Sequence, residues 1–179
     1  MPTQSRELLE GLFRAAVAAA HPSRCLPPAL PEPPPDGRLL ILAAGKGAGS
    51  LTEVAEAHYL ARMPQNRFDG IAVTRHGYGR PTKRIAMVEA GHPVPDAAGL
   101  AGTERALALA DGAGKEDLVL VLLSGGASAN WIAPAPGISL AEKQATTRAL
   151  LRSGANIGEI NCVRKHLSRI KGGRLARRA

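Results

Sequence analysis

The sequence predicts an α/β fold, a Rossmann-like and mostly parallel sheet with flanking helices. From about residue 38 onward, short apolar runs alternate with longer segments of helical periodicity. The runs at 38–44 and 117–123 are almost continuously apolar, as strands buried on both faces are. Aromatic residues make up only 3% of the 179 residues, so the core must consist of Ala, Leu, Val and Ile. Such small side chains favour helices packed tightly on a sheet.

Residues 1–37 predict a helix followed by a proline-rich connector, both packed on the domain. Ser5 can cap a helix that runs to about Ala20. One face of this helix carries Leu8, Leu9, Leu12, Phe13 and Ala16. The stretch 21–37 holds too many prolines for a helix or a central strand, so we expect an extended connector ordered by docking. A mobile linker is the alternative.

Residues 38–179 predict the Rossmann-like portion itself. Strands are expected at 38–44, 70–74, 84–90 and 117–123, and helices at 50–61, 96–110, 139–153 and 159–170. Two neighbouring strands without a helix between them interrupt an otherwise regular alternation. No internal repeat is visible.

The charge balance points to an anionic partner. Lys and Arg number 23 against 15 Asp and Glu, a formal net charge of +8. Nucleic acid, an acidic membrane surface and a phosphorylated small molecule are all compatible with this excess. The few aromatic residues are scattered and offer no platform for stacking bases, so nucleic acid is disfavoured.

The sequence offers no membrane or metal signal. No apolar run approaches the roughly 20 residues that span a bilayer, and the N-terminus does not read as a signal peptide. Cys25 and Cys162 lie far apart without ligand-like spacing, so we expect free thiols, no metal site and a cytoplasmic location.

A first glycine turn, AAGKGAGS at 43–50, directly follows a predicted strand. Free amides around Gly45 and the charge of Lys46 suit an anion at a helix start. The turn departs from a Walker loop, which needs Ser or Thr where Gly47 stands, and from G-x-G-x-x-G, whose third glycine is Ser50. An anion site and a plain strand-to-helix turn are both compatible with these residues.

A second glycine turn, LLSGGASA at 122–129, follows the last predicted strand. It supplies consecutive amides at Gly125 and Gly126 and hydroxyls at Ser124 and Ser128, and we favour an anion nest over a packing turn. It does not match the G-x-S-x-G elbow of hydrolases. His92, on a loop between Gly and Pro, is interpreted as structural or exposed, with a substrate contact as the alternative.

The end of the chain is strongly basic. From residue 161 onward there are seven Lys or Arg and no Asp or Glu. On the helix predicted there, Asn161 and Lys165 share a side with Ser168, and Arg164 and Lys171 lie beside them. A polyanion site is favoured, because a solvated basic helix would normally mix both charge signs.

Six segments in chain order resemble the bacterial-type glycerate 2-kinases, a family that also carries the name hydroxypyruvate reductase of tartrate degradation. They are GKGAGSLTEVAEA, VTRHGYG, EAGHPVPDAAGL, DLVLVLLSGGASA, APAPGISLAEKQATTRALLRSGANIGEIN and VRKHLSRIKGGRLA. Together they cover nearly the whole chain after about residue 38.

The resemblance implies transfer of the γ-phosphoryl group of ATP to the 2-hydroxyl of D-glycerate, with Mg²⁺, giving 2-phosphoglycerate. The lysine of the family's GK motif corresponds to Lys46, which is therefore the expected catalytic residue. Phosphoryl transfer needs positioning and positive charge more than covalent chemistry. The expected phosphate- and substrate-binding residues are Gly45, Ser124, Gly125, Gly126, Ser128, Asn161, Arg164, Lys165 and Lys171.

The chain departs from the family in three ways. Gly47 and Ala127 stand where the family usually has Ala and a third Gly. Family members are also about twice as long and add further strands and a second domain, so the fold is expected to be truncated, with half of the site present. A homodimer is left open. The alternatives to the kinase are an NAD(P)H-dependent hydroxypyruvate reductase and a non-catalytic module that binds polyanions or nucleic acid.

Overall fold

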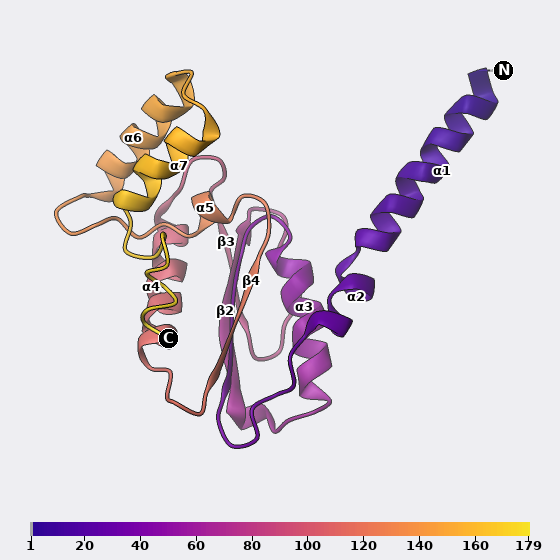
Figure 1. Cartoon of the computed structure of the whole chain (residues 1–179), viewed down its shortest axis with the longest axis horizontal. Helices are drawn as coiled ribbons and strands as arrows, with labels where there is room; N and C mark the ends of the chain where they lie inside the picture. The colour runs from indigo at the N-terminus through magenta and orange to yellow at the C-terminus, as the bar shows by residue number, and fades with distance from the viewer. Residues whose placement is uncertain (1) are drawn as a thin grey trace.

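The computed structural model describes residues 2–179 and contains one parallel sheet with the strand order β3-β2-β1-β4. Figure 1 shows this sheet with helices on either side. The strands are β1 (Leu39–Ala44), β2 (Phe68–Arg75), β3 (Ala86–Ala90) and β4 (Leu118–Leu123). All three pairings are parallel. The predicted α/β class and its parallel sheet are confirmed.

The central strand β1 divides the core in two. Its residues alternate between the faces of the sheet, as every strand's do. Leu39 and Ile41 pack with the helix α3 (Ala48–Leu60) on one face, whereas Leu42 and Ala44 pack with α4 (Ala97–Asp111) on the other. Every residue of β1 is fully buried, which explains its unbroken apolar run. The two helices therefore lie on opposite faces of the sheet (Figure 1).

The order in which the chain adds strands to the sheet reverses beside β1, which creates a topological switch point there. The chain runs from β1 through α3 to β2, reaches β3 by a loop, and returns through α4 to β4 on the other side of β1. In the loop before β3, the buried carboxylate of Glu56 accepts the backbone N–H groups of residues 83–85 at 2.7–2.9 Å. Open α/β sheets bind ligands where the strand order reverses, which here is the carboxyl end of β1 and β4.

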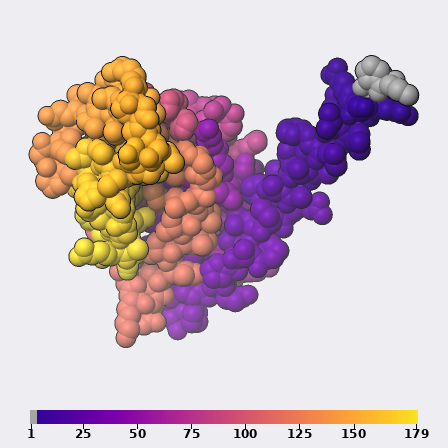
Figure 2. Space-filling view, turned by 45° about the horizontal axis from the view of Figure 1, so that its top comes forward, coloured from indigo at the N-terminus to yellow at the C-terminus, as the bar shows by residue number. Residues whose placement is uncertain are grey.

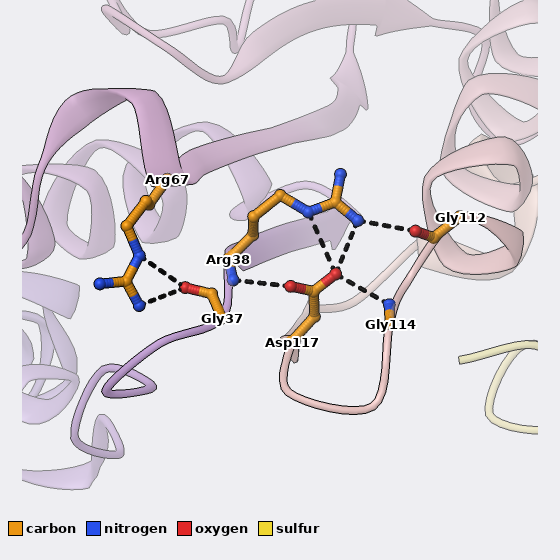
Figure 3. Close-up of polar contacts among 6 residues, drawn as sticks. All are labelled: Gly37, Arg38, Arg67, Gly112, Gly114 and Asp117. Carbon is orange, nitrogen blue, oxygen red and sulfur yellow. Dashed lines mark hydrogen bonds and ion pairs between the residues drawn. The ribbon is translucent and has the colours of Figure 1, made fainter.

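The opposite end of the sheet is closed by an ion pair between the starts of β1 and β4. Figure 3 shows Arg38 and Asp117 joined by their side chains, with Nη2 of Arg38 2.6 Å from Oδ2 of Asp117. The same Asp117 carboxylate accepts the amides of Arg38 and Gly114. Arg67 donates to the carbonyl oxygen of Gly37 and thereby fixes the connector before β1.

The N-terminal segment is only partly packed. The helix α1 (Pro2–Ala20) projects away from the body of the molecule (Figure 2), and its apolar face is exposed at Leu8, Leu9, Leu12, Phe13 and Val17. The expectation that this helix packs on the domain is therefore wrong. The connector does dock, through α2 (Pro22–Cys25), a 3-10 turn at Pro27–Ala29 and a hydrogen bond of 2.7 Å from the Tyr59 hydroxyl to the Pro31 carbonyl. No helix among residues 2–179 is long and apolar enough to span a membrane.

Three further helices follow β4. They are α5 (Ala127–Asn130), α6 (Leu140–Arg152) and α7 (Ile157–His166), and α6 and α7 each begin with a capping box. A second short 3-10 turn, Gln65–Arg67, precedes β2.

The helix α7 ends four residues earlier than expected. Buried Ser168 forms a bridge with Pro134 instead, and its hydroxyl accepts the amides of Ile170 and Lys171. Ser168 and Lys171 therefore do not continue the basic face of the helix. The two glycines that follow have positive φ and keep the chain turned.

Candidate functional site

The two glycine turns meet at the switch point. The amide of Lys46, after β1, donates to the carbonyl of Gly125, after β4, at 2.8 Å. The amide of Gly47 donates to the hydroxyl of Ser124, also at 2.8 Å. Because β1 and β4 are neighbours in the sheet, turns that lie about 80 residues apart in the sequence form one structure.

Two glycines are required for this close approach. Gly45 has a φ of +115°, and a Cβ on it would lie 2.4 Å from Oγ of Ser124. Gly126 has a φ of +91°, and a Cβ there would lie 2.9 Å from Nε2 of His92 and 3.3 Å from Cγ of Lys46. Both backbone conformations are poorly accessible to other residues. The turns are thus fixed by backbone contact, and His92 and Lys46 flank the second one.

The joined turns present groups that suit an anion. The side chain of Lys46 is exposed and forms no hydrogen bond or ion pair with any residue in 2–179. The amides of Gly125 and Gly126 are likewise unused by the described part of the chain. A lysine with adjacent unused amides provides positive charge and hydrogen-bond donors at one place.

The loop after β3 brings His92 to the same place. Fully buried Asn130, at the end of α5, donates to the carbonyls of Ala90 and Gly91 at 3.4 Å. Gln144 of α6 donates to the carbonyl of Pro95 at 2.8 Å. Burial, together with the charges of Lys46, Arg75 and Arg164, lowers the pKa of His92 below its ordinary value. The loop is therefore held from two helices, and the imidazole is neutral near pH 7.

Three cations gather where α7 ends. Lys143 is 2% exposed, and its ammonium donates to the carbonyls of Arg164 and Leu167 at 3.3 and 2.8 Å. Lys171 donates to the carbonyl of Trp131. Burial, with the charge of Arg164, lowers the pKa of Lys143 to about 8. Burial, with the charges of Arg164 and Lys143, lowers the pKa of Lys171 to about 7.

This group of cations lacks acidic partners. None of the ion pairs formed by residues 2–179 involves Lys143, Arg164 or Lys171. Burial also lowers the pKa of Arg164. Buried positive charge without a counter-ion is costly, and a bound anion would reduce that cost.

The structure brings together only some of the residues singled out in the sequence. Gly45, Lys46, Ser124, Gly125 and Gly126 form one site, and Arg164 lies close enough to influence His92 electrostatically. The Ser124 hydroxyl, however, is occupied in joining the two turns, since it accepts the amide of Gly47.

The other singled-out residues lie apart from the joined turns. Ser128 lines a groove of about 580 Å³ between β4 and the C-terminal segment, and Lys171 reaches the same groove. Asn161 and Lys165 are exposed on α7. Asn161 and Lys165 remain candidates only because they belong to the basic segment that begins at residue 161.

Sequence reasoning missed two residues and undervalued a third. Lys143 sits in an ordinary polar helix sequence, and only the fold shows that it is buried at the end of α7. Arg75 ends β2 and faces the site because parallel strands share one carboxyl edge. His92 carried a signal, a histidine held between Gly and Pro after a strand, but was interpreted as structural or exposed.

Among residues 2–179, no group of three or more His, Cys, Asp or Glu side chains could hold a metal ion. The groups assembled at the turns are cationic and hydrogen-bond-donating instead. Their chemistry fits an anionic ligand such as a phosphate group.

Comparison with known proteins gives a consistent picture. The chain is 44% identical over 141 residues to a glycerate 2-kinase of Pyrococcus horikoshii, covering 79% of this chain and 31% of that protein. It is 41% identical over 178 residues to a D-glycerate 2-kinase of Thermotoga maritima, covering 99% and 42%. A relative from Agrobacterium vitis, 43% identical and covering 98% and 39%, is named provisionally as a hydroxypyruvate reductase. The resemblance inferred from the motifs is confirmed.

A solved structure agrees with the fold. The crystal structure of the glycerate kinase from Thermotoga maritima superposes with a TM-score of 0.83 at 38% identity, covering 99% of this chain and 42% of that one. The chain thus spans about two fifths of the length of these relatives. Residues 8–179 match the family described as a domain of unknown function, DUF4147, so the chain belongs to the DUF4147 family.

Proposed function

We propose that this chain supplies the phosphate-binding and substrate-binding half of a glycerate 2-kinase, which transfers the γ-phosphoryl group of ATP to the 2-hydroxyl of D-glycerate. The observation that carries the proposal is the junction of the two glycine turns at the switch point, with unpaired Lys46 and two unused amides. The names and identities of the relatives supply the reaction class.

Each residue has a distinct role in the proposal. Lys46 is the catalytic residue, because its free ammonium can neutralise charge that develops on the transferred phosphoryl group. The amides of Gly125 and Gly126 hold phosphate oxygens. Arg164 binds the glycerate carboxylate, for which a guanidinium has the matching two-pronged geometry. Gly45 and Ser124 shape the turns.

The remaining candidates have supporting roles. Lys171 and Lys143 add positive charge beside Arg164. Asn161, Lys165 and Ser128, which lie apart from the joined turns, would contact the more distant parts of the ligands. Mg²⁺ would enter with ATP, bound to its phosphates, as is usual for this ion.

The proposal extends to cellular context. We expect a cytoplasmic location, where ATP is available. Association of two copies stays a prediction. The exposed side chains of Val121 and Leu123 on the outer strand β4 are the surface on which we expect it.

The test is a pair of assays on the purified chain. The first supplies ATP, Mg²⁺ and D-glycerate and follows 2-phosphoglycerate by phosphorus NMR, and the second supplies hydroxypyruvate and follows NADPH consumption. We expect product in the first assay, with about a 100-fold loss in Lys46→Ala. Lys115→Ala, an exposed lysine at the opposite end of the sheet, is the matched control and should leave the rate unchanged.

A binding measurement keeps the proposal testable if half of a site cannot turn over. ATP and 2-phosphoglycerate should shift the amide NMR signals of Gly125 and Gly126 in the original chain and not in Lys46→Ala. Oxidation of NADPH by hydroxypyruvate would refute the kinase assignment in favour of the reductase named among the relatives. Absence of both turnover and binding would refute the proposal for this chain.

A further inference from the structure

We propose that His92 is a catalytic residue of this site and accepts the proton of the reacting hydroxyl group. The inference rests on the proposed function and adds a residue that the glycine turns alone do not supply. In the transfer, the 2-hydroxyl oxygen of D-glycerate forms a bond to the γ-phosphorus, and the bond from that phosphorus to the bridging oxygen breaks. ADP keeps the bonding electrons, and the hydroxyl proton passes to Nε2 of His92.

His92 lies next to the second glycine turn and to Lys46. The point at which a Cβ of Gly126 would stand is 2.9 Å from Nε2 and Cδ2 of His92 and 3.3 Å from Cγ of Lys46. The imidazole edge and the lysine stem therefore both border the turn proposed to hold phosphate. A hydroxyl that attacks a phosphoryl group held beside Lys46 would therefore lie close to this imidazole.

The second argument is availability. The His92 side chain is half-buried and makes no hydrogen bond to any other residue among 2–179. His76, by contrast, pairs with Asp96 at 3.1 Å, and His166 binds the carbonyl of Cys162 at 2.7 Å. Apart from a contact with its own backbone, the His92 imidazole is therefore free for a ligand.

The third argument is charge. The groups that act on the imidazole are Lys46 after β1, Arg75 at the end of β2 and Arg164 on α7, and all three are cations. The nearest acidic side chain on its own loop, Asp96, is engaged by the amide of Gly99 and by His76. Burial and these cations lower the pKa of His92, so the neutral, proton-accepting form dominates at pH 7.

The fourth argument is rigidity. The buried amide of Asn130 holds the loop at Ala90 and Gly91, and Gln144 holds it at Pro95, so residues on both sides of His92 are fixed. Proton transfer requires a base kept within hydrogen-bond reach of the reacting group.

The experiment compares His92→Gln with His58→Gln. Gln keeps the polarity of a histidine and cannot accept a proton in this range. His58 is a matched control, because burial and Arg62 lower its pKa in the same direction and it lies on α3 outside the site. We expect His92→Gln to reduce phosphoryl transfer about 100-fold with an unchanged KM for ATP, and His58→Gln to leave both unchanged.

The pH profile separates a proton acceptor from a structural residue. The rate of the original chain should fall as the pH drops through the pKa of His92, and His92→Gln should lose this limb. A reduced rate with the acidic limb intact would overturn the inference.

Histidine NMR tests whether His92 contacts the ligands, and it does not depend on turnover. Adding D-glycerate together with a non-hydrolysable ATP analogue should shift the imidazole signals of His92 and leave those of His58 in place. If the amides of Gly125 and Gly126 respond while His92 does not, the role of His92 is overturned and the proposed kinase site stands. If neither responds, both fail.

Discussion

Replacing Gly45 by Ala should destabilise the protein strongly, because the two turns of the site meet there. The φ of +115° costs about 1–2 kcal/mol for a residue with a Cβ. The added Cβ would also lie 2.4 Å from Oγ and 2.5 Å from the carbonyl oxygen of Ser124, and relieving such overpacking costs about 1–3 kcal/mol. The expected loss in the free energy of unfolding is therefore about 2–5 kcal/mol.

Two other glycines separate these contributions. Gly77 also has a positive φ, +78°, but no atom lies within 4 Å of its added Cβ, so Gly77→Ala should lose only the backbone cost of about 1–2 kcal/mol. Gly47 has a φ of −94°, and its added Cβ would make ordinary contacts at 3.4 Å with Ser124. Gly47→Ala should therefore change stability by less than about 1 kcal/mol.

Urea unfolding at 25 °C, followed by circular dichroism, measures the series. With a dependence of about 2 kcal/mol per molar urea, Gly45→Ala should lower the midpoint by about 1–2.5 M. The three variants should rank Gly45→Ala, Gly77→Ala, Gly47→Ala in decreasing loss. If Gly45→Ala costs no more than Gly77→Ala, the turns are not in contact as described, and the case for a joined site fails with them.

Three further substitutions test other parts of the structure. Glu56→Ala should lose about 2–4 kcal/mol in urea unfolding, because three backbone amides, that of buried Ile85 among them, lose a charged acceptor. Since Arg38 lowers the pKa of Asp117 from 3.8 to about 2, their pair should stabilise the fold fully above about pH 4, and stability should fall as the pH drops toward 2. This decline should be weaker in Asp117→Asn. The pKa of Lys171 is lowered from 10.5 to about 7, which means that the charged form of Lys171 destabilises the folded state. The free energy of unfolding should therefore rise between about pH 7 and 10.5. Lys171→Met should raise the free energy of unfolding by about 1–3 kcal/mol at pH 7. The same substitution should weaken the binding of 2-phosphoglycerate, as measured by calorimetry.

Local patterns in the sequence predicted most helices and strands within a few residues, because apolar runs and capping residues act on the segment in which they stand. The run at 38–44 indicated a buried strand, and β1 occupies Leu39–Ala44. Ser139 and Ser153 marked the limits of a helix, and they are the residues that cap α6 at its two ends. The predictions failed where contacts with distant parts of the chain determine the local structure. Ser168 leaves the helical path because it is buried against Pro134, and nothing in its neighbours announces this.

The exposed stripe of α1 is a second instructive failure. Leu8, Leu12 and Phe13 follow a helical period that normally indicates a buried face, yet these side chains are 64%, 59% and 69% exposed. Periodicity establishes that a face is apolar but says nothing about which surface covers it. The prediction of a helix was correct, and the prediction of its packing was not.

The site required one piece of information that no local pattern contains, the order of the strands. The first glycine turn by itself was as compatible with a tight turn as with an anion site, and the second only favoured an anion nest. Once β4 lies beside β1, the amide of Lys46 meets the carbonyl of Gly125, and His92 arrives from β3 on the loop that Asn130 holds. The same arrangement explains why the cations need no acidic partner within the described residues. Under the proposed function, phosphoryl groups would carry the compensating charge, and a carboxylate placed there would compete with the ligand for Lys46 and Arg164.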